Sequence, residues 1–223
     1  MKTVVLAVVG LAREARIAKR AGLVSIVGSG NSELLAQRLQ AVVPTVEAII
    51  SFGIAGSLAP LLRVGDAVVA THVVTDNHHY ACDPTWSRIL RTRLPDARSA
   101  VIVGVDTPAS HIAHKKNLFR MTGAHAVDME SHIAARFAVE RGVPFVALRV
   151  ISDGSERTLP PAALEPLKPS GKPRLFAVLR SIVSEPDQLP ELVQTARETN
   201  AAFRTLLRCR HLLGPALGCP YLG

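Results

Sequence analysis

Short apolar runs rich in Val, Ile and Ala alternate with helical segments over the first two thirds of the chain, and this order constrains the fold most. Two helical segments, 32–42 and 129–141, repeat their apolar residues at helical spacing. The order predicts an α/β protein with a mostly buried sheet. The apolar runs that we interpret as strands are Thr3–Val9, Leu23–Val27, Val46–Phe52, Ala67–Val74, Ala100–Val105, His125–Val127 and Pro144–Ile151.

The last third of the chain differs from this alternating part. Residues 159–173 include five prolines, which predicts a loop or lid after the last strand, and the residues beyond them favour helix. A chain of 223 residues with 48% hydrophobic content can bury a substantial core as one domain. We expect a catalytic core over 1–158, with the proline-rich loop and a C-terminal helical region, 159–223, packed on the same domain.

Length and cysteine content exclude several protein classes. The apolar runs are far shorter than the roughly 18 residues of a membrane-spanning helix. The first run is too short for an export signal and lacks a cleavage site. The three cysteines, Cys82, Cys209 and Cys219, have no CxxC spacing, so they indicate neither a disulfide framework nor a zinc site. These features predict a cytoplasmic protein.

The chain is strongly basic, with a net charge of +8 and a pI near 10.0. This charge favours anionic partners such as nucleic acid, phosphate or an acidic membrane surface. The basic residues are spread along the chain and aromatic residues make up only 4% of it, which disfavours nucleic acid. Phosphate and a membrane surface remain as candidate partners.

The C-terminal helical region has an amphipathic, basic pattern with two interpretations. We favour a helix that packs its apolar stripe on the domain and exposes its arginines to water. The alternative is reversible contact with the inner membrane surface. The pattern consists of Phe203, Leu206, Leu207 and Leu213 beside Arg197, Arg204, Arg208 and Arg210.

Polar residues close three of the apolar runs, where open α/β sheets gather their ligands. Ser152 and Asp153 end the last run, Asp128 and Glu130 stand between a strand and a helix, and 51–57 is rich in glycine. Each feature also has a structural interpretation, because aspartates form turns and caps and carboxylates favour helix N-termini. A glycine-rich passage lets backbone amides approach a ligand.

Four motifs follow one another in the chain: FGIAGSLAP, VGDAVVA, AVDMESHIAARFA and VPFVALRVISD. Through their order, residues 3–155 resemble the purine nucleoside phosphorylase and methylthioadenosine/S-adenosylhomocysteine nucleosidase superfamily. Within this superfamily the chain is most similar to the hopanoid-associated phosphorylases, through the segments GLAREARIA, SFGIAGSL, AVDMESH and FRTLLRCRHLLGP. The resemblance implies a three-layer α/β/α fold with a central mixed β-sheet. It also implies cleavage of a 5′-substituted adenosine with release of adenine.

The resemblance assigns roles to the residues at the strand ends. Glu130 holds the ribose hydroxyls, Met129 packs on the sugar, Asp153 protonates or hydrogen-bonds purine N7, and Ala55 and Gly56 form the floor beneath the substrate. These roles suit a reaction that develops positive charge on the ribose and negative charge on the leaving base. Asp153 then needs or shares a proton at neutral pH. The resemblance also implies that Asp128 and Ser152 lie at the substrate and that Asp106–Ala109 runs along the purine.

The nucleophile side departs from the nucleosidase pattern. Counting from Gly10 places the water-activating glutamate of the nucleosidases at Ala15, whereas the neighbouring Arg13 has a guanidinium suited to phosphate. We therefore predict phosphorolysis with inorganic phosphate as co-substrate, although no second phosphate-binding arginine precedes Gly53. Two alternatives stay open: Glu14 reaches a water if the register shifts by one, and Arg13 lies on a solvated helix face.

A fourth strand end, Gly28–Asn31, precedes a predicted helix. Its Ser29 belongs to an anion site at the helix N-terminus or to a simple turn and cap. The adjacent His78 and His79 do not indicate a metal site, because neighbouring side chains of a strand point to opposite faces.

These observations lead to one prediction with two alternatives. The predicted protein is a cytoplasmic homo-oligomer that releases adenine from adenosylhopane in hopanoid biosynthesis without a metal or other cofactor, and a peripheral position at the inner membrane face stays an alternative. A methylthioadenosine/S-adenosylhomocysteine nucleosidase is the alternative of the same class. A nucleoside-binding module without turnover is the alternative of a different class.

Overall fold

The computed structural model describes residues 4–19, 23–42 and 46–222. The start of the first predicted strand, Thr3, lies outside these residues. The strands are β1 (Val4–Val9), β2 (Leu23–Val27), β3 (Val46–Ser57), β4 (Ala67–Val74), β5 (His79–Ala81), β6 (Arg98–Gly104), β7 (Ala126–Asp128) and β8 (Phe145–Asp153). The α-helices are α1 (Ala12–Ala18), α2 (Ser32–Gln40), α3 (Pro84–Arg93), α4 (Ile112–Thr122), α5 (Ser131–Arg141), α6 (Leu175–Ser184) and α7 (Leu189–Leu213). Short 3₁₀ turns are η1 (Pro161–Ala163), η2 (Pro186–Gln188) and η3 (Pro215–Gly218).

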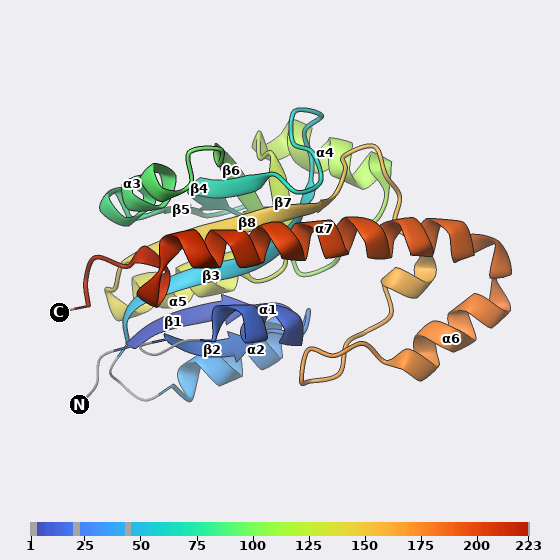
Figure 1. Ribbon diagram of the computed structural model, residues 1–223, viewed down its shortest axis with the longest axis horizontal. Coiled ribbons are helices and arrows are strands. Elements are labelled where there is room, and N and C mark those ends of the chain that lie inside the picture. The colour runs from blue at the N-terminus through green and yellow to red at the C-terminus, as the bar shows by residue number, and fades with distance from the viewer. Residues whose placement is uncertain (1–3, 20–22, 43–45, 223) are drawn as a thin grey trace.

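The strands form one mixed sheet in the order β2-β1-β3-β7-β6-β4-β5, with β8 paired to both β3 and β4. The pair β3/β8 is parallel, whereas β4/β8 and β3/β7 are antiparallel. Because β3 pairs with β7 as well as β8, and β4 pairs with β6 as well as β8, this part of the sheet closes on itself. Helix α7 contacts β8 in front and α5 contacts it from behind (Figure 1). The predicted α/β fold with a central mixed sheet is confirmed.

The register of β8 against β3 positions the strand ends that the sequence indicates. All nine residues of β8 are buried, as its continuous apolar run predicts. The two parallel strands finish side by side, and an irregularity between Ala55 and Gly56 brings Gly56 opposite Asp153. Strand β7 joins the same end of β3, where Gly56 pairs with Val127. Ala55, Asp128 and Asp153 therefore lie at one end of the sheet.

Helix α5 begins at Ser131, two residues later than the sequence predicts. The Asp128 carboxylate accepts hydrogen bonds from the backbone N–H groups of Glu130 (3.1 Å) and Ser131 (2.8 Å). These bonds hold Met129 and Glu130 in a tight turn ahead of the helix. The structural interpretation of Asp128 is therefore supported as a turn former, since the N-cap residue of α5 is Glu130, and this turn orients Glu130.

Helix α7 packs its apolar stripe on the domain. Phe203, Leu206 and Leu213 are buried, while Leu207 is 42% exposed. The packing interpretation of the C-terminal stripe is therefore correct, because those side chains cover β8 and its neighbours. Among the described residues, no helix combines the length and apolar character needed to cross a bilayer.

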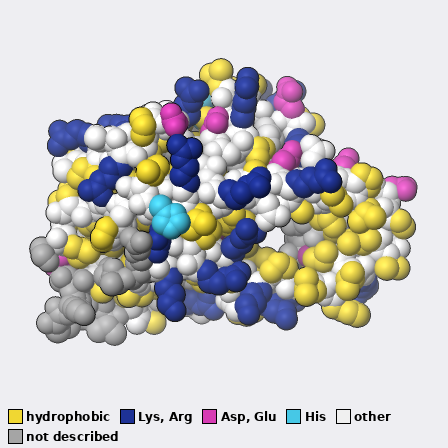
Figure 2. Space-filling model, in the orientation of Figure 1, with side chains coloured by type: hydrophobic (Ala, Val, Ile, Leu, Met, Phe, Trp, Pro, Cys, Tyr) yellow, Lys and Arg dark blue, Asp and Glu magenta, His cyan; other side chains and the backbone are white. Residues whose placement is uncertain are grey.

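Helix α6 behaves differently from α7, since none of its residues is buried. It follows the proline-rich loop and stands away from the sheet (Figure 1). Hydrophobic side chains gather on the surface at this end of the molecule (Figure 2). The structure therefore has an exposed apolar helix that we did not predict.

Candidate active site

A cavity of about 210 Å³ opens at the ends of β3, β7 and β8. The predicted segment along the purine contributes Pro108 and Ala109, and the proline-rich loop contributes Leu159 and Leu167. The cavity thus gathers segments from most of the chain. Most of the predicted site residues line it: Glu14, Ala55, Gly56, Asp128, Met129, Glu130, Ser152 and Asp153.

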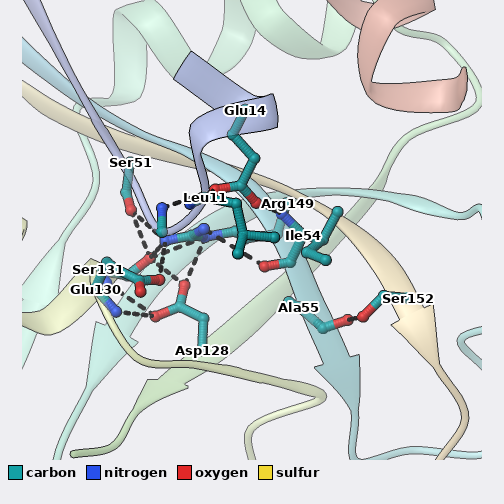
Figure 3. Close-up of polar contacts among 11 residues, drawn as sticks. Leu11, Glu14, Ser51, Ile54, Ala55, Asp128, Glu130, Ser131, Arg149 and Ser152 are labelled. Carbon is teal, nitrogen blue, oxygen red and sulfur yellow. Dashed lines mark hydrogen bonds and ion pairs between the residues drawn. The ribbon is translucent and has the colours of Figure 1, made fainter. Parts of the chain in front are cut away.

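The fully buried side chain of Arg149, in the middle of β8, organises one side of the cavity (Figure 3). Its Nε lies 2.6 Å from Asp128 Oδ2, and its Nη2 lies 3.6 Å from Glu130 Oε2. Nη2 also donates to Ser51 Oγ at 2.6 Å. A buried guanidinium needs such partners, since an unpaired charge in the core is strongly unfavourable. Arg149 thereby fixes the two carboxylates.

Glu14 enters the same cavity from α1 and is only 1% exposed. Its Oε2 accepts hydrogen bonds from the N–H groups of Gly10 (2.7 Å) and Leu11 (2.8 Å), and its Oε1 accepts one from Ile54 N–H (2.8 Å). Gly53 makes room for this arrangement, because a Cβ there would collide with the Glu14 carboxylate and the Arg149 guanidinium. The glycine-rich passage therefore serves the close approach of buried charges.

Three carboxyl groups, those of Glu14, Asp128 and Glu130, share one guanidinium in this buried cluster. Burial raises the pKa of Glu14, an effect that Arg149 and the three backbone hydrogen bonds partly oppose. Burial also raises the pKa of Glu130 to about 8; Arg149 opposes this shift, and the neighbouring Asp128 and Glu14 add to it. The cluster can therefore hold a proton near neutral pH and exchange it.

Asp153 lies on the other side of the cavity, with Lys115 behind it. The fully buried Lys115 Nζ donates to Asp153 Oδ2 at 2.5 Å, to the Gly154 carbonyl at 2.8 Å and to the Arg157 carbonyl at 3.0 Å. Ser152 Oγ lies 2.9 Å from Asp153 Oδ1. The carboxyl group is therefore held at both oxygens.

Neither Lys115 nor Arg149 is among the predicted site residues. Arg149 has a visible signal, because it is the single charged residue inside the apolar run Pro144–Ile151. Lys115 has none, since the adjacent Lys116 belongs to the same segment and is exposed.

The structure places Arg13 away from the cavity, contrary to our prediction. Its guanidinium donates to Asn200 Oδ1 at 2.5 Å and lies 4.3 Å from the centre of the Phe203 ring. Glu14, and not Arg13 or Ala15, points into the cavity, while Ala15 packs against the core. Successive residues of a helix differ by about 100° in direction, so adjacent positions of α1 face different surroundings.

Ser29 also lies outside the cavity lining. Its Oγ donates to the Pro169 carbonyl at 2.9 Å, and its neighbour Gly30 lines the cavity instead. Asn31 caps α2 by accepting from Leu34 N–H at 2.8 Å, as the turn-and-cap interpretation predicts. His78 stacks on Tyr80. No cluster of three or more metal-ligating side chains occurs among residues 4–19, 23–42 and 46–222.

The fold and the cavity define an enzyme of the nucleoside phosphorylase and nucleosidase class. Residues 2–184 match the model of the phosphorylase superfamily, and the chain belongs to this superfamily. A search of curated protein sequences finds no significant match.

Solved structures of nucleosidases share the fold over nearly their whole length. A Helicobacter pylori 5′-methylthioadenosine/S-adenosylhomocysteine nucleosidase variant with 5′-methylthioadenosine in its active site is similar, with a TM-score of 0.65 and 14% identity over 92% of this chain and 97% of that chain. The Streptococcus pyogenes S-adenosylhomocysteine nucleosidase has a TM-score of 0.61 and 17% identity over 92% of this chain and 98% of that chain. The H. pylori futalosine hydrolase has a TM-score of 0.61 and 14% identity over 93% of this chain and 98% of that chain. At this identity the likeness concerns the fold.

Proposed function

We propose that this protein cleaves the N-glycosidic bond of a 5′-substituted adenosine and releases adenine. The observation that carries the proposal is the pairing of two buried polar groups in one cavity. Asp153, held by Lys115 and Ser152, serves the purine, and Glu130, held by Arg149, serves the ribose. The reaction needs a proton donor at the base and an acceptor for the sugar hydroxyls.

In the proposed step the C1′–N9 bond breaks and its electron pair leaves with adenine. The Asp153 carboxylate, paired with the Lys115 ammonium, passes a proton from that ammonium to N7, which neutralises the departing base. Glu130 accepts hydrogen bonds from the ribose hydroxyls while positive charge develops on the sugar. Met129 packs against the sugar, and Ala55 and Gly56 lie beneath the substrate.

Water is the nucleophile that the geometry supports best. The prediction of phosphorolysis rested on Ala15 and Arg13, but Glu14 occupies the cavity and Arg13 faces α7. No lysine or arginine is among the described residues that line the cavity, and phosphate beside the Glu14 carboxylate would meet like charge. In hydrolysis, Glu14 takes a proton from the water that attacks C1′.

For the substrate we propose adenosylhopane, which places the reaction in hopanoid side-chain synthesis. The support is the resemblance of GLAREARIA, SFGIAGSL and AVDMESH to the hopanoid-associated phosphorylases. Leu159 and Leu167 of the proline-rich loop add apolar wall to the cavity, which suits an apolar 5′ substituent. We further propose that the protein is a cytoplasmic homo-oligomer. Light scattering, which measures the mass of the particle in solution, tests the oligomeric state.

Adenine release from adenosylhopane and from 5′-methylthioadenosine tests the proposal. Turnover of adenosylhopane at the higher kcat/KM supports it, and preference for methylthioadenosine identifies an ordinary nucleosidase. Binding of both without release identifies a nucleoside-binding module. Run in oxygen-18 water with and without phosphate, the assay separates the nucleophiles: oxygen-18 at C1′ supports hydrolysis, and a phosphate-dependent 1-phosphate product supports phosphorolysis with phosphate as co-substrate.

A further inference from the structure

The outward side of α6 is an unpartnered apolar face. Leu175, Phe176, Leu179 and Val183 are 72%, 83%, 60% and 79% exposed. Their spacing places all four within about 100° of the helix circumference. Soluble proteins rarely leave such a cluster uncovered unless it contacts a partner or a membrane. We call these four residues the α6 face; they belong to the end of the molecule where hydrophobic side chains gather in Figure 2.

The α6 face is held in place by the inner side of the helix. The buried Gln188 donates from Nε2 to the Ser181 carbonyl at 2.8 Å and accepts from Ala162 N–H at 2.8 Å. These bonds tie α6 to η1 and to the start of α7. The apolar residues therefore point outward because their helix is anchored by its opposite side.

Basic residues lie on α6 and beside its N-terminal half. Residues 168–184 carry four basic residues and no acidic one, and the acidic Glu185 and Asp187 follow beyond the end of the helix. A hollow of about 830 Å³ beside α6 is lined by Arg16, Lys168, Lys172, Arg174 and Phe176, among others. None of these cations is ion-paired within the described part of the chain. An apolar helix face with Phe and Leu, flanked by Lys and Arg, is typical of helices that lie in a membrane interface.

The same segment connects the α6 face to the active-site cavity. Leu159 and Leu167, which precede α6, line the cavity. The Gly171 carbonyl accepts from Ala12 N–H at 3.1 Å, at the start of the helix that carries Glu14. Any surface on which the α6 face docks would therefore lie close to the wall of the active-site cavity.

We propose that the α6 face docks on an anionic lipid surface, with Phe176 and its neighbours in the interface and the nearby basic residues at the headgroups. A second copy of the chain is a poorer occupant. A two-fold contact would bring residues 168–184 of both copies together, each with four positive charges and no negative one. An anionic leaflet instead supplies the opposite charge and an apolar layer. The inference goes beyond the proposed function and does not depend on it, because docking needs no substrate.

Sedimentation of the full chain with vesicles tests the proposal. We expect binding to vesicles of equal parts phosphatidylcholine and phosphatidylglycerol, none to phosphatidylcholine alone, and weaker binding as salt rises. The double variant Phe176→Ser/Leu179→Ser should weaken binding at least about tenfold. Its matched control, Leu61→Ser/Met121→Ser, changes two apolar residues that are 79% and 72% exposed elsewhere on the molecule and should bind like the wild type.

A charge variant keeps the test decisive if the serine variant does not fold. Lys172→Glu/Arg174→Glu changes only exposed side chains and should lose binding, whereas Arg197→Glu/Arg204→Glu on α7 should retain it. Circular dichroism confirms folding of each variant. The proposal is overturned if the wild type binds neither vesicle, if the α6 variants bind normally, or if light scattering shows that they dissociate an oligomer. Vesicle binding without adenine release would leave docking intact and refute the proposed function.

Discussion

The ammonium of Lys115 lies 2.5 Å from Asp153 Oδ2, and both side chains are buried. Lys115 comes from α4 and Asp153 ends β8, so the pair joins two elements that are distant in sequence. The other two contacts of Lys115, to the carbonyls of Gly154 and Arg157, fix the chain just beyond β8. Lys115 thus positions the group to which we assign the purine.

Asp153→Asn should lower kcat for adenine release at least about 100-fold with little change in KM, because a positioned acid acts mainly in the transition state. Steady-state kinetics on a soluble 5′-substituted adenosine measure this. The exposed Asp76→Asn serves as control and should behave like the wild type. Near-normal turnover of Asp153→Asn would remove Asp153 from the mechanism.

Lys115→Met should lower kcat and also destabilise the protein by about 3–5 kcal/mol, because it leaves the buried Asp153 without its cation. Urea unfolding and the pH profile of kcat measure the two effects. Lys115→Arg should restore part of the activity by restoring the charge. The adjacent, exposed Lys116→Met is the matched control and should leave both quantities unchanged; equal effects of the two Met variants would contradict the role of Lys115.

Glu14→Gln should lower kcat at least about 100-fold, since an amide cannot take the proton of an attacking water. Arg13→Ala should leave kcat and any phosphate dependence unchanged, because its guanidinium contacts Asn200 and Phe203. The rate of adenine release by each variant, measured with and without phosphate, checks both expectations. The reverse result, with Arg13→Ala losing a phosphate-dependent activity, would restore phosphorolysis.

Protein stability should fall as pH rises toward 8, and Glu130 should account for much of the change. Its folded-state pKa is raised from 4.5 to about 8, so the folded protein binds more protons than the unfolded chain between these values. The free energy of unfolding should therefore decrease over that range by at least about 1 kcal/mol. Glu130→Gln should flatten this dependence in urea unfolding, while the exposed Glu33→Gln should not; an unchanged slope in Glu130→Gln would contradict the raised pKa.

Local sequence patterns predicted the strands of the described chain except the short β5, and the polar residues that end them. Asp128, Glu130 and Asp153 are recognisable because each follows an apolar run, and the carboxyl ends of strands are where ligands gather. The amphipathic pattern of α7 likewise predicted its buried stripe, because apolar residues at helical spacing need a surface to cover. These features depend on neighbours in the chain.

The partners of the site residues depend on tertiary structure. Lys115 and Lys116 are indistinguishable locally, yet only the former faces Asp153, because the docking of α4 selects one side of the helix. Glu14 rather than Ala15 enters the cavity for the same reason, since one residue along α1 turns the side chain by about 100°. The sequence by itself thus determined the core strands, though not the short β5, and the polar residues that end them. Strand register and helix docking, which no local pattern encodes, decided which buried charges meet and which apolar helix face stays exposed.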